Sequence, residues 1–341
     1  MTSRDPESPA TSQDENVYVS TGALPSHEAV RALVATAHER FRGVSDGKLA
    51  DYIPALAEAD AAWFGICVAD THGDTCAVGD AEQTFSIQSV SKPFAFALVC
   101  DRLGAQEAAS RLGVDATGLA FNSVMAVELR PGHTSNPLVN SGAIATTSLV
   151  PGANAGERWD NLREGLSRFA GRRLELDRRV YESEAAHNAR NSGIAHLLHG
   201  YGRVYCDPDQ ATDVYTRQCS LLVSARDLAV MGATLAGGGI NPLTGLRVVS
   251  AETCRRVLAV MATAGLYERS GDWLYDVGLP GKSGVSGGIV TVAPGKGAVA
   301  TFSPPLDDAG NSVRGRLATR FLSERAGLNL FASAAAPSNL R

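Results

Sequence analysis

Strand-like segments lie near both ends of the chain and a long helical stretch lies between them, and this order constrains the fold most. Trp63–Asp70 and Thr75–Val78 predict a hairpin around the turn Thr71–Asp74. Residues 89 to 265 show mostly helical periodicity. Later segments predict strands at Trp273–Gly278, Val285–Val292 and Ala298–Phe302 and a helix at Ser312–Ala326. We therefore expect an α+β fold whose antiparallel sheet is built from both termini and flanked by helices.

Capping residues predict several helix ends. Ser26 precedes an amphipathic segment with apolar residues at helical spacing. Ser224 and Asp227 form a capping box before a second apolar segment, and the glycines from Gly237 to Gly239 end that helix.

A length of 341 residues suits one large domain or two lobes. We expect a disordered segment at 1–22, a single domain at 23–330 and a tail at 331–341. Within the domain, an α/β lobe is expected from 23–88 together with 266–330, and a helical lobe from 89–265.

Charge and cysteine content exclude several functional classes. The net charge is −5 and the pI is about 5.8, so we expect no nucleic-acid partner. The six cysteines are scattered without a CxxC pair, which indicates free thiols and no zinc site. The first residues lack an apolar signal region and no apolar segment is long enough to cross a membrane, so we expect a cytoplasmic protein without membrane contact.

Lysine is scarce, because only four of the 31 basic residues are lysines. One of them, Lys92, stands three residues after Ser89. Arginine supplies positive charge equally well but does not release its proton near neutral pH. Pro93 is tolerated mainly in the first turn of a helix, so a helix should begin close to Ser89. We expect the positive end of that helix to favour neutral Lys92, the form that can accept the Ser89 proton.

A lone Ser-x-x-Lys motif more often reflects an N-cap and a surface lysine. A second short motif, Lys282-Ser283-Gly284, favours the catalytic interpretation because it resembles the Lys-Thr-Gly element of penicillin-recognising enzymes. An edge strand beginning there could offer the backbone N–H of Val285 to a carbonyl under attack. Taken alone, the motif is equally compatible with a glycine-rich turn.

Several polar residues are candidates for substrate binding. Asn136 and Pro137 predict the start of a helix that places Asn140 on its first turn. The Asn140 amide could bind substrate there or act only as a local helix cap. Glu184 and Asn191 are seven residues apart, so one helix would bring them onto one face. Such a pair could hold an α-amino acid, with the carboxylate on its ammonium and the amide on its carboxylate. An exposed helical face is the alternative.

Tyrosines are the remaining candidates. A phenol can donate to a carboxylate or pass a proton to a leaving amine. Spacing alone does not single out any of the eight tyrosines.

Together, the motifs resemble the serine-dependent glutaminase family, of the simple bacterial type, whose fold is that of serine β-lactamases. The matching segments span about residues 25 to 325 in the family's order. They are Asp51–Ala57, Phe85–Lys92, Asn136–Ile144, Ser183-Glu184, Arg190-Asn191, Asp213–Tyr215, Gln218–Ser220 and Val277–Gly288.

The resemblance implies hydrolysis of L-glutamine to L-glutamate and ammonia without a cofactor or metal, by a homodimer or homotetramer. Ser89 would be the nucleophile and Lys92 its base. Tyr267 would assist proton transfer with Tyr215 nearby, and the amides of Ser89 and Val285 would form the oxyanion hole. The amino acid would be bound by Tyr52, Asn140, Glu184 and Asn191, beside the two other tyrosines. In this arrangement the Lys282 side chain gives electrostatic support.

Two other functions remain compatible with these motifs. A β-lactamase or transpeptidase shares Ser-x-x-Lys and the Lys-x-Gly strand but is normally exported. A non-catalytic amino-acid sensor on the same fold would not need Ser89. Asparagine also remains a possible substrate, because one methylene changes binding by only about 1–3 kcal/mol.

Overall fold

The computed structural model describes residues 23–51 and 53–332, so the expected disordered segment 1–22, Tyr52 and residues 333–341 lie outside the described residues. Seven strands are described: β1 (Gly65–Asp70), β2 (Thr75–Gly79), β3 (Phe85–Ser86), β4 (Leu222–Val223), β5 (Gly281–Ser283), β6 (Gly288–Ala293) and β7 (Gly297–Phe302). The first six α-helices are α1 (His27–Phe41), α2 (Lys92–Leu103), α3 (Ala105–Leu112), α4 (Met125–Glu128), α5 (Asn140–Ser148) and α6 (Ala155–Ala170). The others are α7 (Arg178–Ala186), α8 (Ala189–Gly200), α9 (Pro208–Cys219), α10 (Ala225–Ala236), α11 (Ala251–Ala264), α12 (Ser270–Val277) and α13 (Val313–Arg325). Three short 3-10 helices are η1 (Pro54–Leu56), η2 (Gln88–Ser91) and η3 (Tyr267–Arg269).

Both ends of the chain contribute to one five-stranded sheet, in the order β2-β1-β7-β6-β5, with every neighbouring pair antiparallel. The N-terminal hairpin joins the C-terminal strands through β1 and β7, where Gly65 pairs with Phe302 and Asp70 with Gly297. The expected α+β fold with a sheet built from both termini is therefore confirmed. Within this sheet β5 is an edge strand.

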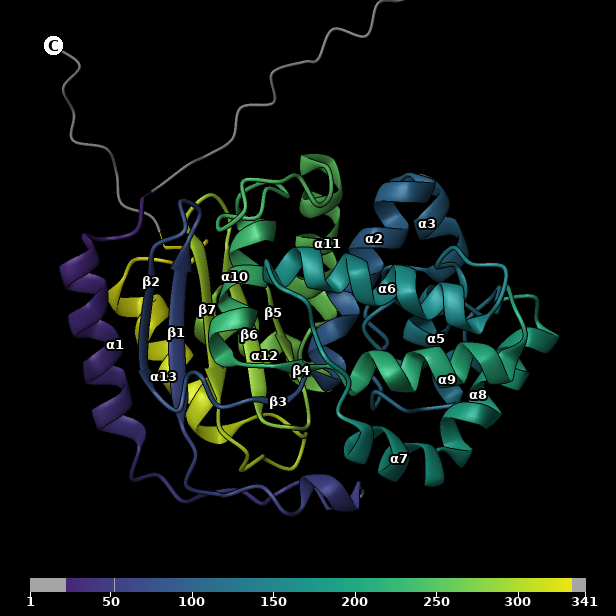
Figure 1. Ribbon diagram of the computed structural model, residues 1–341, viewed down its shortest axis with the longest axis horizontal. Helices are drawn as coiled ribbons and strands as arrows, with labels where there is room; N and C mark the ends of the chain where they lie inside the picture. The colour runs from purple at the N-terminus through teal and green to yellow at the C-terminus, as the bar shows by residue number, and fades with distance from the viewer. Residues whose placement is uncertain (1–22, 52, 333–341) are drawn as a thin grey trace, which may run out of the picture.

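Helices cover both faces of the sheet (Figure 1). α1 and α13 pack on each other and on one face, while α10 packs on β1, β6 and β7 from the other. Because both faces are covered, every residue of β6 and β7 is buried. Their sequences are accordingly almost continuously apolar rather than alternating.

The helices α2, α5, α6, α8 and α9 form a group beside the sheet, on the right in Figure 1. α2 lies inside this group, where Phe94 packs on Phe169 of α6 with ring centroids 5.2 Å apart. β3, which pairs with β4 in a small two-stranded sheet, precedes η2 and the start of α2 in the chain. Among the residues that the structure describes, no helix has the length and apolar character needed to cross a membrane.

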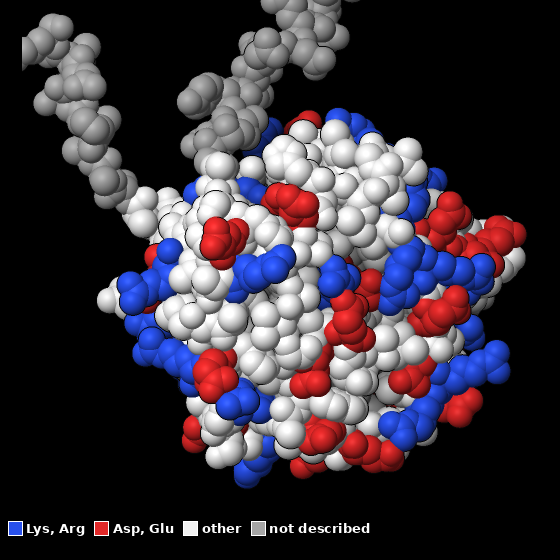
Figure 2. All heavy atoms as spheres, turned by 60° about the vertical axis from the view of Figure 1, so that its left-hand side comes forward, with Lys and Arg blue, Asp and Glu red and all other residues white. Residues whose placement is uncertain are grey.

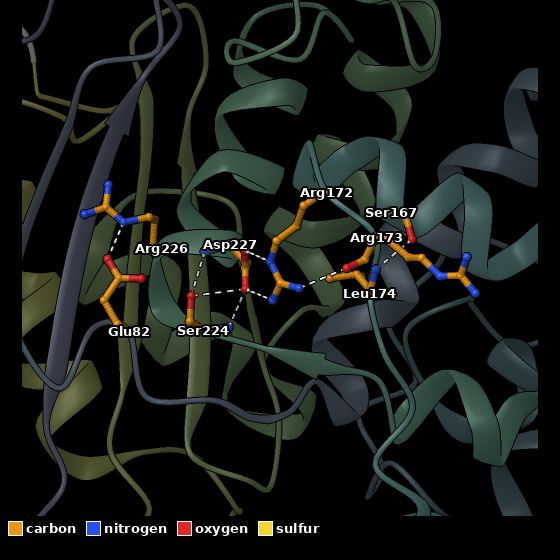
Figure 3. A network of polar contacts seen from close by, with 8 residues as sticks. All are labelled: Glu82, Ser167, Arg172, Arg173, Leu174, Ser224, Arg226 and Asp227. Atoms are coloured by element: carbon orange, nitrogen blue, oxygen red, sulfur yellow. Dashed lines mark hydrogen bonds and ion pairs between the residues drawn. The ribbon is translucent and has the colours of Figure 1, made fainter.

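An ion pair connects α6 to α10 (Figure 3). Arg172, two residues past the end of α6, donates to both carboxylate oxygens of Asp227 at 2.7 and 2.6 Å. Asp227 also accepts from the backbone of Ser224, which completes the expected capping box of α10. The carboxylate is buried and bidentate, so this pair should contribute more than an exposed one.

Two predictions near the C-terminal end were wrong. The segment Trp273–Gly278 is the helix α12 and not a strand, because Trp273 and Val277 are buried at helical spacing while Tyr275 between them is 89% exposed. The strand expected at Val285–Val292 begins only at Gly288. Lys282 lies on a strand of its own, β5, and a turn with Gly287 at φ +100° separates it from β6.

The start of α5 also differs from the expectation of a cap at Asn136. The Asn136 side chain accepts from the backbone of Leu138 at 3.0 Å in a turn, so the helix begins at Asn140. This turn folds back over the first turn of α5. A Cβ atom on Gly142 would lie 1.9 Å from the Asn136 carbonyl oxygen. A glycine at position 142 therefore allows the turn to pack against the helix and so fixes the position of Asn140.

Charged side chains of both signs are interspersed over the face shown in Figure 2. This mixture corresponds to the modest net charge of −5. Most ion pairs are formed by exposed arginines with nearby carboxylates, such as Arg111 with Glu107 at 2.6 Å. Pairs of this kind contribute little to stability.

Substitution Gly142→Ala should destabilise the protein by about 1–3 kcal/mol, because the added methyl group overlaps a backbone carbonyl that cannot move alone. Gly193→Ala is the matched control, since it lies inside α8 with no atom within 4 Å of the added Cβ. That control should be neutral or slightly stabilising. Urea unfolding measures both free energies, and equal values for the two variants would contradict the packing argument.

Candidate active site

Ser89 lies in η2, which leads directly into α2 at Lys92 and Pro93. The preceding residue, Gln88, is buried and has a left-handed backbone with φ +48°. Such a conformation is unfavourable for a non-glycine residue and is typical of functional sites. The backbone N–H of Ile87 donates to Leu221 and fixes the entry to this turn. The expected helix start near Ser89 is thus present, as a 3-10 turn followed by the α-helix.

Lys92 is buried, with 1% of its surface exposed. Its Nζ donates to Oδ1 of Asn140 at 2.7 Å, and the hydroxyl of Tyr215 donates to the same oxygen at 3.2 Å. Burial lowers the pKa of Lys92 to about 8, because the ammonium loses its hydration. The sequence predicts this effect from the helix dipole, whereas burial is the largest cause of the lowered pKa of Lys92.

Glu184 is a buried carboxylate that forms no ion pair within the part of the chain that the structure describes. Burial raises its pKa to about 7, and the nearby Lys92 and a hydrogen bond from Gln88 oppose that rise. Nε2 of Gln88 donates to Oε2 at 3.4 Å. A carboxylate in this environment gains strongly from a bound cation.

Glu184 and Asn191 do not share one helix, so that prediction was wrong. α7 ends at Ala186 and α8 begins at Ala189, because His187 and Asn188 leave the helical conformation between them. The amide of Asn191 nevertheless reaches the site. Its Oδ1 accepts from Nδ2 of Asn140 at 2.9 Å.

Tyr267 is buried at the start of η3 and also has a left-handed backbone, with φ +57°. Its hydroxyl donates to the carbonyl of Ser283 on β5 at 3.2 Å. Burial raises the pKa of Tyr267 to about 12, and the nearby side chains of Ser89 and Ser283 oppose that rise. The phenol therefore lies beside the nucleophile and keeps its proton at neutral pH.

Val285 is buried in the turn that follows β5, one turn residue beyond the edge strand. A cavity of about 840 Å³ opens beside it. Phe121, Glu268 and Val285 are among its lining residues, and Glu268 is the neighbour of Tyr267 in the chain. Tyr52 falls outside the described residues, so its proposed contact with the substrate stays a prediction.

The sequence reasoning did not identify Gln88, Gln218 or Phe121. Gln218 is fully buried and donates to the hydroxyl of Ser91 at 2.8 Å, and this hydrogen bond stabilises η2. The Phe121 ring packs on that of Tyr267 with centroids 4.9 Å apart, and its carbonyl accepts the backbone N–H of Asn140 at 2.8 Å. Gln88 stood inside a matching segment, but its backbone conformation has no sequence signal.

The arrangement combines the groups that acyl transfer needs. A serine lies at the start of a helix, and a buried lysine of lowered pKa lies in the next turn. A neutral phenol stands beside the serine. The buried carboxylate of Glu184, which has no ion pair among the described residues, is available for the ammonium of an amino acid.

Comparison with known proteins identifies the family of the chain. The family model described as Glutaminase matches residues 47–331. Glutaminase 2 of Yersinia pestis is 60% identical over 316 residues, which cover 93% of each chain. The solved structure of the probable glutaminase ybaS has a TM-score of 0.89 and 44% identity, over 91% of this chain and 100% of that one.

A more distant solved structure is the probable glutaminase from Bacillus subtilis complexed with 6-diazo-5-oxo-L-norleucine. It has a TM-score of 0.76 and 28% identity, over 89% of this chain and 95% of that one. The fold, the ordered motifs and the family match lead to one conclusion: the chain belongs to the glutaminase family, whose enzymes hydrolyse the side-chain amide of L-glutamine to L-glutamate and ammonia.

Proposed function

We propose that this protein hydrolyses L-glutamine through an acyl-enzyme formed on Ser89, with Lys92 as the general base. The observation that carries the proposal is a buried lysine, three residues after a serine, whose pKa of about 8 leaves about one tenth of the amine neutral at pH 7. Neutral Lys92 takes the Oγ proton as Ser89 attacks the amide carbon of glutamine. The backbone amides of Ser89 and Val285 hold the developing oxyanion.

Departure of ammonia requires a proton on the leaving nitrogen. The phenol of Tyr267, beside Ser89, is suited to pass that proton from Lys92. Water then attacks the ester carbon, loses its proton to Lys92 and releases L-glutamate. Ser89 regains its proton in the same step, so no group is consumed.

Glu184 is suited to the ammonium of glutamine, and Asn191 and Tyr52 to the carboxylate. The bound ligand of the Bacillus subtilis neighbour supports this assignment in kind, since 6-diazo-5-oxo-L-norleucine is an amino acid with a C5 carbonyl where glutamine has its amide carbon. Asn140 and Tyr215 link this binding region to the base through the hydrogen bonds on Oδ1.

Substrate binding should also favour the reactive form of Lys92. The charge of Glu184 raises the pKa of Lys92, so it stabilises the ammonium form in the free enzyme. An ammonium group paired with Glu184 neutralises that charge. The proton on Lys92 then becomes easier to lose at the moment when glutamine is bound.

Ser89→Ala should lower ammonia release from glutamine on the order of 10⁴-fold or more, because the nucleophile is removed. Ser110→Ala, on the exposed surface of α3, is the matched control and should keep full activity. Steady-state assays with glutamine, asparagine and nitrocefin compare the candidate substrates. Turnover of nitrocefin without glutamine hydrolysis, or an active Ser89→Ala variant, would refute the proposal.

Asn140→Asp should move the pH dependence of kcat. Only neutral Lys92 is a base, so kcat should rise as the pH rises through about 8 in the wild type. A carboxylate 2.7 Å from Nζ would stabilise the ammonium and move this rise to higher pH by about one to three pH units.

The matched control is Asn161→Asp, which adds the same charge on the exposed surface of α6. Its pH profile should superimpose on that of the wild type. An unchanged profile for Asn140→Asp would show that Lys92 is not the titrating base.

A further inference from the structure

Lys282 is a second fully buried lysine, and the mechanism above does not use its side chain. Its Nζ donates to the carbonyl oxygen of Ser283 at 2.7 Å. The same oxygen accepts the hydroxyl of Tyr267 at 3.2 Å. Nζ also lies 4.1 Å from the centroid of the Tyr267 ring. One backbone carbonyl of the edge strand β5 thus brings the amine and the phenol together.

The burial of this amine is costly. Among the residues that the structure describes, Lys282 forms no ion pair with a carboxylate. Burial and the nearby Lys92 both lower the pKa of Lys282 well below its ordinary value. A methionine could fill the same volume without a buried polar group, so stability does not explain the lysine.

Tyr267 needs support from its surroundings. Its left-handed backbone, with φ +57°, is unfavourable for an aromatic residue. Its ring contacts Phe121 as well as the Lys282 amine. Its hydroxyl donates to the Ser283 carbonyl, and the Ser89 side chain is near enough to influence the pKa of the phenol. A small rotation of the ring would therefore separate the hydroxyl from the nucleophile.

We propose that Lys282 is a positioning residue, which holds the Tyr267 phenol beside Ser89 through the shared Ser283 carbonyl and its contact with the ring. This role rests on the proposed serine mechanism and is distinct from that of Lys92, which acts on Ser89 directly. It replaces the expectation from sequence that Lys282 gives general electrostatic support. A purely electrostatic lysine would not need the Tyr267 hydroxyl in order to act.

A double-mutant cycle separates the two roles. Lys282→Met and Tyr267→Phe should each lower kcat at least about tenfold, with a smaller change in KM, because general acid–base catalysis contributes about 10²–10⁴-fold. The double variant should be no slower than Tyr267→Phe alone, because Lys282 acts through the hydroxyl that is already missing. Multiplicative losses in the double variant would overturn the proposal.

Lys296→Met is the matched control, because Lys296 lies in the turn between β6 and β7 and donates to the carbonyl of Gly327. It should leave kcat unchanged. Lys282→Met should unfold in urea at the same concentration as the wild type or a higher one, while its activity falls. A loss of stability that accounts for the loss of activity would contradict the positioning role.

If Lys282→Met does not fold, Lys282→Gln gives the same cycle, since its amide can still fill part of the space and donate a hydrogen bond. Where both variants fold, partial rescue of kcat by glutamine relative to methionine is expected, and an equal loss in both would count against the proposal. The Ser89→Ala variant distinguishes the two levels of failure. If that variant is inactive while the cycle is multiplicative, only the role of Lys282 is refuted.

Discussion

The burial of Lys92 is the constraint on which the active site depends. The Lys92 amine, at 1% exposure, donates to Oδ1 of Asn140 and forms no ion pair among the described residues, and its burial favours the neutral form that a base requires. Asn140 can hold it because α5 begins at that residue. Gly142 in turn permits the preceding turn to fold against the helix. The position of Asn140, and with it the hydrogen bond to Lys92, therefore depends on close backbone packing at Gly142, two residues further along the chain.

The fold places these groups where the edge strand β5 meets the helices that lie beside the sheet. The edge strand β5 comes from the C-terminal part of the chain, and η2 and α2 follow the N-terminal hairpin. α5, α7 and α8 supply the polar side chains. Two residues next to the chemistry, Gln88 and Tyr267, have left-handed backbones that cost energy and persist because the packing around them holds them. At this site, tertiary packing therefore outweighs the intrinsic backbone preferences of these two residues.

Sequence reasoning predicted the features that depend on local signals. The hairpin, the capping box of Ser224 and Asp227, and the sheet built from both termini follow from spacing and caps, and all are present. The Ser89 and Lys92 pair was found because lysine is scarce. What failed depended on tertiary contacts. The break between α7 and α8 separates Glu184 from Asn191. The only sequence signal for a helix end at this break is Asn188, whose side chain donates to Thr216 on α9. The roles of Gln88 and Phe121 also follow from packing between distant segments.

The central claim is that burial lowers the pKa of Lys92 to about 8, so that some of the amine is neutral near neutral pH. Because the chain has only four lysines, labelling them with ¹³C at Cε gives four resonances to follow. Single substitutions assign each resonance to its lysine. A pH titration followed by NMR then measures the pKa of each amine directly. The account predicts that the Lys92 signal titrates near pH 8. A Lys92 signal that titrates at the ordinary lysine value, about 10.4, would contradict it.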